Sequence, residues 1–323
     1  AYRERTGDIF GGIRCLPLTV RNFGNAYHGK GKLLHSTGTT GAPTYFIYTE
    51  NDLDIGCNVL ARAWWRMGLR PGDVMLVGWG GMNATDWHLE AAHNENTAGR
   101  IGAFYFIYNA IDPAPDFEIA EQLEAQGIHI KWIFATISGF RWFLQKMEQE
   151  GKNLKRDYFP QVKCMLQSGE LSKSLLDYGC KLFGIPICGC SAVPDALWTG
   201  KSACFYEWEE GDGARMSLHA PEDTHFVEIF PLGSNKAVEG AEFGEPVITN
   251  LFSKAMAYIR FRTEDLAYIR YDPCPYCGYT HMQCRIKSRV SESVNVKGKY
   301  VTMGDVEDIL YTHPESRPLP AQL

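Results

Sequence analysis

Short apolar runs alternate with amphipathic stretches through the first 200 residues, and this alternation most constrains the fold. Residues 51–69 have helical spacing, with acidic residues in the first turn and arginines late, which suits the helix dipole. Residues 71–73 then turn the chain into the apolar run 74–77, the pattern of a buried strand. The same reasoning predicts further strands of this type over 104–107, 131–135 and 164–167, and helices over 117–126 and 138–150. Strands that alternate with helices imply βαβ units, so we expect an α/β fold with a mainly parallel, doubly covered sheet.

The pattern changes near residue 200. Short strands with alternating apolar and polar side chains follow, as at residues 225–230 and 246–249. This alternation is typical of antiparallel strands. We therefore expect α/β layers over residues 1–200 and a smaller antiparallel or barrel-like, β-rich unit over residues 201–288.

Composition excludes several classes of protein. With 323 residues, 45% of them apolar, the chain can bury a full core and is not a disordered protein. A net charge of −6 without a long basic run argues against nucleic acid as a partner. No apolar stretch approaches the roughly 20 residues that span a bilayer, and the charged residues 1–6 do not read as a secretion signal. We expect a cytoplasmic protein that binds neither nucleic acid nor membrane, with a homodimer as one option for its assembly.

A loop rich in glycine and hydroxyl groups precedes the apolar run 45–48. Backbone N–H groups in such a loop can form a concavity that binds an anion, and serine and threonine hydroxyls add further donors. The alternative is an ordinary glycine- and threonine-rich turn before a strand. On the first interpretation the residues that hold phosphate are Ser36, Thr37, Gly38, Thr39, Thr40 and Gly41.

Four later segments follow this loop in a recognisable order. They read QSGE at 167–170, CGCS at 188–191, IRFRTEDLA at 259–267 and RIKSR at 285–289. In this order the chain resembles the adenylate-forming (ANL) superfamily and, within it, the phenylacetate–CoA ligase-like branch. The segment IRFRTEDLA is similar to that family's RYRTGDLA, and the resemblance covers about residues 15–312.

The resemblance implies a large N-terminal domain over residues 1–288, with residues 289–323 as the hinge and the start of a small C-terminal domain. The implied reaction joins a carboxylate to the α-phosphate of ATP, giving an acyl-AMP and pyrophosphate, with Mg²⁺ as the metal. A thiol such as coenzyme A then accepts the acyl group. Charge grows on phosphate oxygens in the first step, so fixed hydroxyl and N–H donors are what the chemistry needs.

The resemblance also assigns roles to single residues. Asp265 would accept hydrogen bonds from the ribose hydroxyls, and Arg289 would be the basic partner near ribose and phosphate. The alternatives are an ion pair of Asp265 with Arg262 or Arg270 and a solvated charge at Arg289. Thr40 and Ser191 would act on the reacting phosphate, and the residues that border adenine and the α-phosphate would be Gly169, Glu170, Gly189 and Ser191.

Some positions depart from the family pattern. Ala42 stands where the family usually has a lysine or arginine, and Ala192 stands where it has a glutamate that helps to hold magnesium. Glu264 and Ser288 replace glycines. The family's catalytic lysine lies deeper in the C-terminal domain than residue 323, so either the sequence is incomplete or this member is naturally short.

Cys274 and Cys277 form a Cys-x-x-Cys knuckle that can grip one side of a tetrahedral zinc ion. A second pair of ligands is needed, and Cys204 with His219 is the best candidate, which the resemblance supports. His225, His281 and Cys284 are alternatives for the fourth position. If no second pair exists, these are reduced cysteines in an ordinary turn. The other thiols, including Cys188 and Cys190, read as small core residues rather than nucleophiles.

Aromatic residues gather in the region that forms the acid pocket in the family. Flat aromatic walls suit an aryl or arylalkyl acid, although aromatics at such spacing are core residues more often than pocket walls. His88 and Asn83 could hold the carboxylate. The expected pocket residues are Trp79, Asn83, Trp87, His88, Tyr105 and Phe140.

The leading hypothesis is therefore an adenylate-forming ligase that activates an aromatic carboxylic acid and passes it to coenzyme A. One alternative is an atypical member from secondary metabolism, of the antibiotic or phenazine type, with a carrier or amine as acceptor. Another is a degenerate protein that binds AMP or an aryl acid without catalysis.

Overall fold

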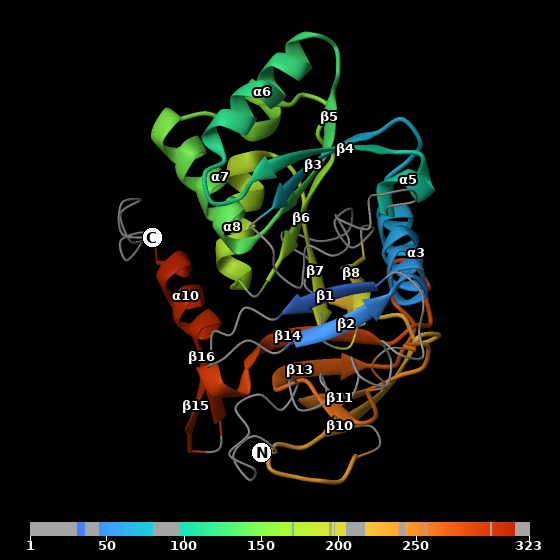
Figure 1. The fold of residues 1–323 in the computed structure, drawn as a ribbon. Coiled ribbons are helices and arrows are strands. Elements are labelled where there is room, and N and C mark those ends of the chain that lie inside the picture. Colours follow the sequence, from blue (N-terminus) through green and yellow to red (C-terminus); the bar gives the residue numbers. More distant parts are fainter. Residues whose placement is uncertain are drawn as a thin grey trace.

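The structure is a computed structural model. It describes residues 31–313 except 36–44, 80–96, 170, 194–195, 197, 205–216, 239–242, 255, 257 and 298. A long mixed sheet runs through this part of the chain (Figure 1). Its strand order is β10-β11-β13-β14-β9-β8-β7-β6-β5-β3-β4, and β12 pairs with β11 beside this path. The sheet has a parallel half and an antiparallel half, which meet at β7 and β8.

The parallel half consists of five strands, and each pairs in parallel with its neighbours. Continuous apolar runs form these strands because both faces of the sheet are covered. The expected α/β architecture is confirmed. The strands are β3 (Val74–Trp79), β4 (Phe104–Asn109), β5 (Ile130–Ala135), β6 (Cys164–Ser168) and β7 (Ile187–Val193).

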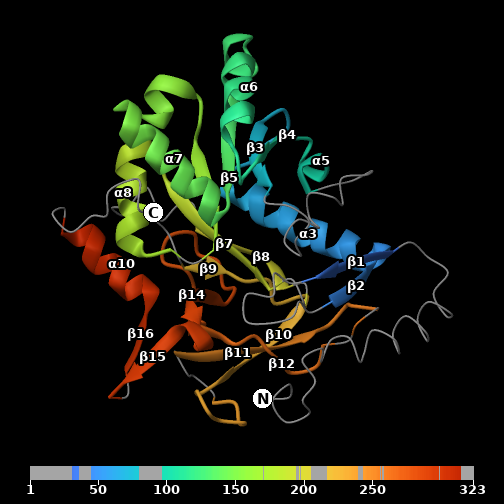
Figure 2. The same cartoon turned by 60° about the vertical axis from the view of Figure 1, so that its left-hand side comes forward.

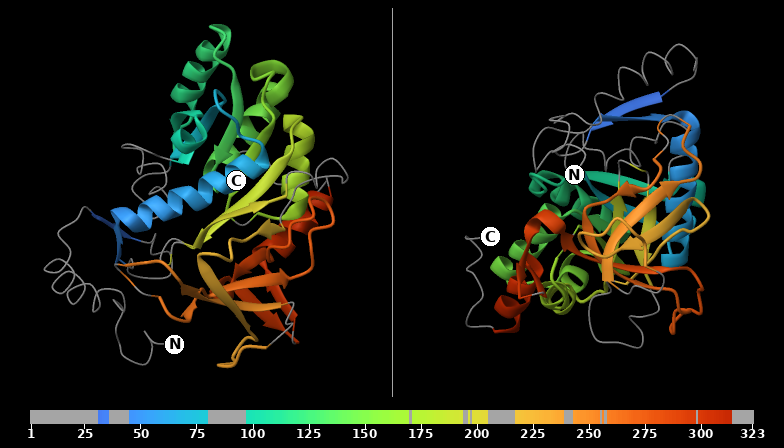
Figure 3. Two further views of the ribbon diagram at one scale, coloured as in Figure 1. Left: turned by 90° about the vertical axis from the view of Figure 1, so that its right-hand side faces the viewer. Right: turned by 90° about the horizontal axis from the view of Figure 1, so that it is seen from below.

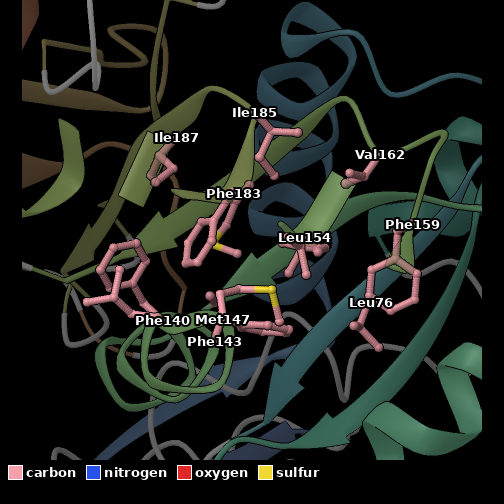
Figure 4. Close-up of a cluster of buried hydrophobic side chains, with 14 of the residues drawn as sticks. Leu76, Phe140, Phe143, Met147, Leu154, Phe159, Val162, Phe183, Ile185 and Ile187 are labelled. Carbon is pink, nitrogen blue, oxygen red and sulfur yellow. The ribbon is translucent and has the colours of Figure 1, made fainter. Parts of the chain in front are cut away.

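Helices pack on the two faces of the parallel half in two separate groups, as two ribbon views show (Figures 1 and 2). One face carries α6 (Ala114–Ala125), α7 (Ile137–Glu150) and α8 (Lys173–Phe183). The core beneath these three helices includes Phe140, Phe143 and Phe183 (Figure 4). The other face carries α3 (Glu50–Met67) and α5 (Thr97–Ile101), over a second apolar cluster.

Helix α3 begins and ends where its sequence signals place the boundaries. The side chain of Thr49 accepts a hydrogen bond from the Asp52 N–H, and the Asp52 carboxylate accepts one from the Thr49 N–H, forming a capping box. At the other end Gly68 has φ +106°, a left-handed conformation that glycine adopts without strain. Acidic residues in the first turn and Arg66 in the last complement the helix dipole.

The antiparallel half continues the same hydrogen-bonded sheet rather than forming a detached unit. Its strands are antiparallel, as the alternating pattern predicts, and they surround a third apolar cluster that includes Trp198, Ile248 and Ile269. The strands are β8 (Trp198–Ala203), β9 (Leu218–His219), β10 (His225–Phe230), β11 (Phe243–Asn250), β12 (Phe261–Arg262), β13 (Asp265–Arg270) and β14 (Gln283–Arg289).

Two hairpins and two short turns lie outside the long sheet. Before α3, β1 (Gly31–His35) and β2 (Tyr45–Thr49) form an antiparallel hairpin. A π-helical turn, η3 (Leu154–Tyr158), links α7 to β6. After β14 come a 3₁₀ turn, η5 (Val290–Glu292), and a hairpin of β15 (Ser293–Val296) with β16 (Lys299–Thr302).

Helix α10 (Met303–Thr312) ends the described chain and packs against α8 (Figure 3). Arg141 on α7 donates to the Glu307 carboxylate at 2.8 Å. The Ser174 N–H, at the start of α8, donates to the Asp308 carboxylate at 2.9 Å. These contacts join α10 to the face that carries α7 and α8.

One expected strand differs in its surroundings. Residues 104–107 read as a strand buried on both faces, but β4 is the outermost strand of the parallel half, and Phe104 is 65% exposed. An apolar run in the sequence does not show whether another strand pairs with its outer edge. Among the described strands, none pairs with the outer edge of β4. Among the described helices, none combines the length and apolar character that crossing a membrane requires.

Candidate functional site

The carboxyl ends of β6 and β7 lie side by side and bring together two of the expected segments. Gln167 is paired with Gly189, and Ser168 with Cys190, in the parallel register. Gly169 therefore leaves the sheet beside Ser191, at the edge where ligands bind in open α/β sheets. Residues 167–169 are thus neighbours of the CGCS segment.

Position 169 requires a glycine. Its φ of +112° is strained for other residues, and a Cβ there would lie 2.6 Å from Cγ1 of Ile137. Ile137 is the first residue of α7. The loop after β6 thus approaches the start of α7 closely enough that only glycine fits.

Asp265 and Arg289 form a second pair of expected site residues. They are directly opposite each other on β13 and β14, and Nε of Arg289 lies 3.2 Å from Oδ1 of Asp265. A guanidinium N–H of Arg289 also donates to the Thr263 carbonyl at 2.8 Å. Burial raises the pKa of Asp265 above its ordinary value, although the charge of Arg289 opposes this rise.

Among the described residues, Asp265 forms its ion pair with Arg289. Arg262 pairs with Glu245 rather than with Asp265. The alternative for Arg289 was a solvated charge, yet its side chain, 46% exposed, is held by Asp265. The two residues assigned to ribose and phosphate therefore position each other, with the guanidinium reaching solvent.

Glu264, which stands where the family has glycine, keeps the backbone conformation that favours glycine. Its φ is +59°, in the left-handed region that non-glycine residues seldom adopt. Two hydrogen bonds hold it there: its N–H donates to the Glu245 carboxylate at 3.0 Å, and its carbonyl accepts from the Val290 N–H at 2.8 Å. The substitution keeps the turn before Asp265 at a cost in strain.

Lys201 is a site neighbour that the sequence did not reveal. It lies on β8 directly opposite Ser191, and its side chain is only 1% exposed. Its ammonium lies 3.7 Å from the centre of the Trp198 ring. The positive charge of Lys201 also favours the ionised form of Asp265, second in effect to Arg289. The sequence around Lys201 does not show that this lysine is buried, because the residues near it belong to β7 and β13, which are separate segments of the chain.

The four predicted metal ligands come together. One ligand atom from each of Cys204, His219, Cys274 and Cys277 lies within 4.8 Å of all the others. Nε2 of His219 is 3.5 Å from Sγ of Cys277. Burial lowers the pKa of His219 to about 4, so its imidazole is neutral, the form that binds metal.

Local turns and sheet register explain why this cluster forms. The Gly278 N–H donates to the Cys274 carbonyl at 2.9 Å, and Gly278 has φ +69°, which closes the knuckle. His219 on β9 is paired with Ser202 on one side and with Gln283 on the other. Cys204 directly follows β8, so the register brings it to the same place.

The three alternatives for the fourth ligand lie outside the cluster. His225 contacts the Ala196 carbonyl at 2.9 Å and the Thr224 hydroxyl at 3.0 Å. Cys284 is buried on β14, and burial raises its pKa to about 12. The ligand atoms of these two residues and of His281 are not among those grouped in the described part of the chain.

Arg66 supplies positive charge beside this cluster. It donates to the Ser202 hydroxyl at 2.6 Å, and its guanidinium lies 5.4 Å from the centre of the Tyr279 ring. Burial lowers the pKa of Arg66, while Cys277, Cys204 and Cys274 act in the opposite direction. A partly buried cation next to three thiols offsets the negative charge that thiolates would carry.

The expected acid pocket requires two corrections. Phe140 lies on the buried face of α7, where its ring meets Phe183 edge-on at 5.7 Å, so it is a core residue. Tyr105 is paired with Met75 near the start of β4 and packs against the α3 cluster. Ser168 lies four positions further along the sheet than Tyr105, about 13 Å, so Tyr105 is far from the carboxyl edge.

Other expected residues lie outside what the structure describes. These are the phosphate loop, including Thr40, together with Glu170, Asn83, Trp87, His88 and the side chain of Trp79. Cys190 is described, and burial raises its pKa to about 12. Its thiol donates to the Gln167 carbonyl at 3.4 Å, which agrees with a core cysteine rather than a nucleophile.

Comparison with known proteins identifies the relatives of this chain, although no family model matches it. Over 305 residues it is 25% identical to a phenylacetate–coenzyme A ligase of Thermus thermophilus, a match that covers 88% of this chain and 60% of that ligase. A phenylacetate–coenzyme A ligase of Aromatoleum evansii is 26% identical over 297 residues, with the same coverage. The chain is a homologue of phenylacetate–CoA ligases. It spans less than two thirds of the length of these relatives.

Solved structures support the same fold. A 2-hydroxyisobutyryl-CoA ligase in its postadenylation state superimposes with a TM-score of 0.71 at 20% identity, over 87% of this chain and 56% of that one. An O-succinylbenzoate coenzyme A synthetase of Bacillus subtilis, in complex with ATP and magnesium ion, gives 0.58 at 16% identity, over 87% and 55%. The chain thus has the same fold as these ligase structures.

Proposed function

We propose that this chain carries the nucleotide-binding part of an adenylate-forming acid–CoA ligase. The observation that carries the proposal is the Asp265–Arg289 pair on adjacent strands of an ANL fold. The phenylacetate–CoA ligases to which the chain is related support the same activity. On this proposal residues 1–288 form the large domain, and residues 289–323 form the hinge and the start of the small domain.

The described residues have defined tasks in this activity. The Asp265 carboxylate accepts hydrogen bonds from the ribose hydroxyls, since an ionised carboxylate offers only acceptors. Arg289 holds that carboxylate and directs positive charge toward the phosphate. Gly169 and Gly189 let the nucleotide approach the backbone at the ends of β6 and β7.

Ser191 has a task at the phosphate itself. Its hydroxyl donates to the α-phosphate as charge develops there. Lys201, directly across from Ser191, adds a fixed positive charge behind these groups. In the proposed reaction the phosphate loop at 36–41, with Thr40, completes the donor set.

Two features of the proposal concern its substrates. ATP with magnesium is the proposed nucleotide, supported by the Bacillus subtilis neighbour whose structure contains both. We propose an aromatic acid as the carboxylate substrate, supported by the names of the related ligases. Coenzyme A is the proposed acceptor.

A structural zinc ion fits the cluster of Cys204, His219, Cys274 and Cys277. Three thiolates and one neutral imidazole are a common donor set for structural zinc, and such sites are closed to substrate. The ion would join β9, the end of β8 and the knuckle after β13. It would supply cross-linking rather than catalysis.

Acid-dependent exchange of pyrophosphate into ATP tests the proposal. With phenylacetate as the acid, the protein should catalyse exchange, and Asp265→Ala should lower the rate by about 10²-fold, the effect of removing a charged contact in a desolvated site. The control is Asp157→Ala, an exposed carboxylate that pairs with Arg156 on η3. If the protein binds nucleotide but catalyses no pyrophosphate exchange with any aromatic or aliphatic acid, it is a binding protein and not a ligase.

A further inference from the structure

A groove lies between α3, α5 and the Cys-x-x-Cys knuckle, on the side of the molecule that carries α3 and α5 (Figure 1). Its cavity measures about 630 Å³, within the range of small-molecule sites. Two of its arginines come four residues before β3 and β4, so this part of the groove lies at the amino edge of the parallel strands, away from the proposed nucleotide site at the carboxyl edge. We call it the arginine groove and define it by Arg62, Arg66, Arg70, Arg100, Cys277 and Tyr279.

Two of the four arginines pair with carboxylates at the border of the groove. A guanidinium nitrogen of Arg62 lies 2.8 Å from a carboxylate oxygen of Asp223, and Arg100 pairs with Asp54. Both carboxylate side chains are more than half exposed, so solvent screens these two ion pairs. The pairs therefore offset only part of the positive charge of the arginine groove.

The other two arginines pair with no carboxylate in the described part of the chain. Arg70 donates to the Trp65 carbonyl at 2.6 Å, and its guanidinium lies 4.3 Å from the centre of the Trp65 ring. Arg66 donates to Ser202, and its Nε is buried without a hydrogen-bond partner among the described residues. Three thiolates around a divalent ion would leave one negative charge, which Arg66 offsets, and the charge of Arg70 then remains. The groove thus keeps a positive balance, which favours small anions.

Cys277 is the residue of the metal cluster that lines this groove. The other three residues of the cluster, Cys204, His219 and Cys274, are at most 4% exposed, whereas Cys277 is only partly buried. Cysteines bind zinc as thiolates, and a partly exposed thiolate beside positive charge is the reactive form of cysteine. Cys284, by contrast, is completely buried and has no such access. Cys277 is therefore the place where an external reagent can reach the cluster.

We propose that Cys277 is a site of reversible modification by small anionic disulfides, which the arginine groove holds beside its sulfur. The Cys277 thiolate attacks one sulfur of the reagent and forms a mixed disulfide. The electron pair of the broken S–S bond goes with the other half of the reagent, which leaves as a thiolate, so no further oxidant is consumed. A free thiol reverses the exchange. This modification does not depend on the proposed ligase function.

The modification opens the metal cluster. A sulfur held in a mixed disulfide is no longer a thiolate ligand, so three of the four ligands remain. The knuckle after β13 then keeps only Cys274 to share a metal ion with Cys204 and His219. The connection between the knuckle, the end of β8 and β9 is thereby weakened, and release of zinc becomes a second measure of the reaction.

Mass spectrometry of tryptic peptides after treatment with oxidised glutathione, an anionic disulfide, tests the site. Cystamine, a cationic disulfide, is the comparison, and each rate is divided by that of the same reagent with an unstructured cysteine peptide. The Cys277 peptide should gain one glutathione about five-fold faster than it gains cysteamine, because the groove repels a cation. Added salt should narrow this difference, and dithiothreitol should remove the adduct. Absence of an adduct on Cys277, or equal relative rates with the two disulfides, would overturn the proposal.

Charge variants test the groove in a protein that keeps all four ligands. Arg70→Glu should lower the rate with oxidised glutathione by about ten-fold and raise the rate with cystamine, and Arg70→Ala should have a smaller effect of the same sign. The matched control is Arg156→Glu, at an exposed arginine on η3, which should leave both rates as in the wild type.

Release of zinc, followed with a chromogenic chelator, should keep pace with formation of the adduct on Cys277. Unchanged rates in Arg70→Glu, or an adduct on Cys277 that leaves zinc fully bound, would contradict the proposal. In protein purified without zinc, the adduct and its dependence on Arg70 still decide whether Cys277 is the modified residue.

Discussion

The two halves of the sheet build their parts of the site in different ways. In the parallel half, the proposed nucleotide-binding residues lie just after β6 and on the neighbouring stretch of β7, and two of them are glycines, Gly169 and Gly189. In the antiparallel half, side chains make the candidate site: Asp265 pairs with Arg289 across strands, and Cys204 and His219 converge on the Cys274–Cys277 knuckle. The candidate site in the parallel half therefore depends on backbone shape, whereas that in the antiparallel half depends on side chains that meet across strands.

Loss of the metal cluster should have the largest effect and should be confined to the antiparallel half. Cys277→Ser removes one ligand, and we expect the free energy of unfolding to fall by about 4 kcal/mol, as is typical when a structural metal is lost. Hydrogen exchange should accelerate in β9, β13 and β14 more than in β5 and β6.

Metal analysis provides the control for this prediction. Cys284→Ala removes a buried thiol outside the cluster and should keep a full equivalent of zinc. If the purified wild-type protein contains less than about half an equivalent of zinc, the cross-link is absent. If hydrogen exchange in Cys277→Ser accelerates equally in both halves of the sheet, the cluster does not stabilise the antiparallel half selectively.

Gly169→Ala tests the dependence of the parallel half on backbone shape. The new Cβ meets Ile137 at 2.6 Å at a positive φ, so we expect a loss of about 1–3 kcal/mol and a large fall in pyrophosphate exchange. Gly127→Ala is the matched control, because φ is +85° there and nothing lies within 4 Å. It should cost about 1 kcal/mol and leave exchange unchanged. Equal effects would mean that the close approach to Ile137 is unimportant.

The raised pKa of Asp265 predicts a pH dependence of stability in the antiparallel half. Above about pH 4 the unfolded carboxyl loses its proton while the native one retains it. Stability should therefore fall as the pH rises through this window, and level off above the native pKa. Asp265→Asn should abolish this fall. Chemical unfolding of both proteins from about pH 4 to pH 7 measures it, and parallel curves would contradict the prediction.

Glu264→Gly should have the smallest effect. Glycine relieves the strain at φ +59° but adds freedom to the unfolded chain, so we expect a gain of about 0.5 kcal/mol. Asp272→Gly, at a position without positive φ, should be destabilising instead. Thermal unfolding of both variants checks the sign. If Glu264→Gly lowers the stability, the Glu264 side chain contributes more to stability than its backbone strain costs.

Much of the fold follows from local patterns. Four predicted strands and three predicted helices of the parallel half match β3, β4, β5, β6, α3, α6 and α7 to within a few residues, because each apolar run or amphipathic stretch is one element. The strand β7 and the helices α5 and α8 were not predicted. The burial of Phe140 and the distance of Tyr105 from the carboxyl edge were not predictable in this way. Aromatic residues in the sequence do not show whether they line a pocket or lie in the core, because the neighbouring elements determine which face of each helix or strand is buried.

The sequence by itself determined the order of the motifs, the Cys274–Cys277 knuckle and the glycine at the end of β6, because each depends on residues close together in the chain. Only the tertiary structure decided that Cys204 and His219 complete that knuckle, that Asp265 pairs with Arg289 rather than Arg262, and that Lys201 is buried opposite Ser191. The physical reason is strand register: hydrogen bonding between distant segments sets which side chains meet, and that register is a property of the whole sheet.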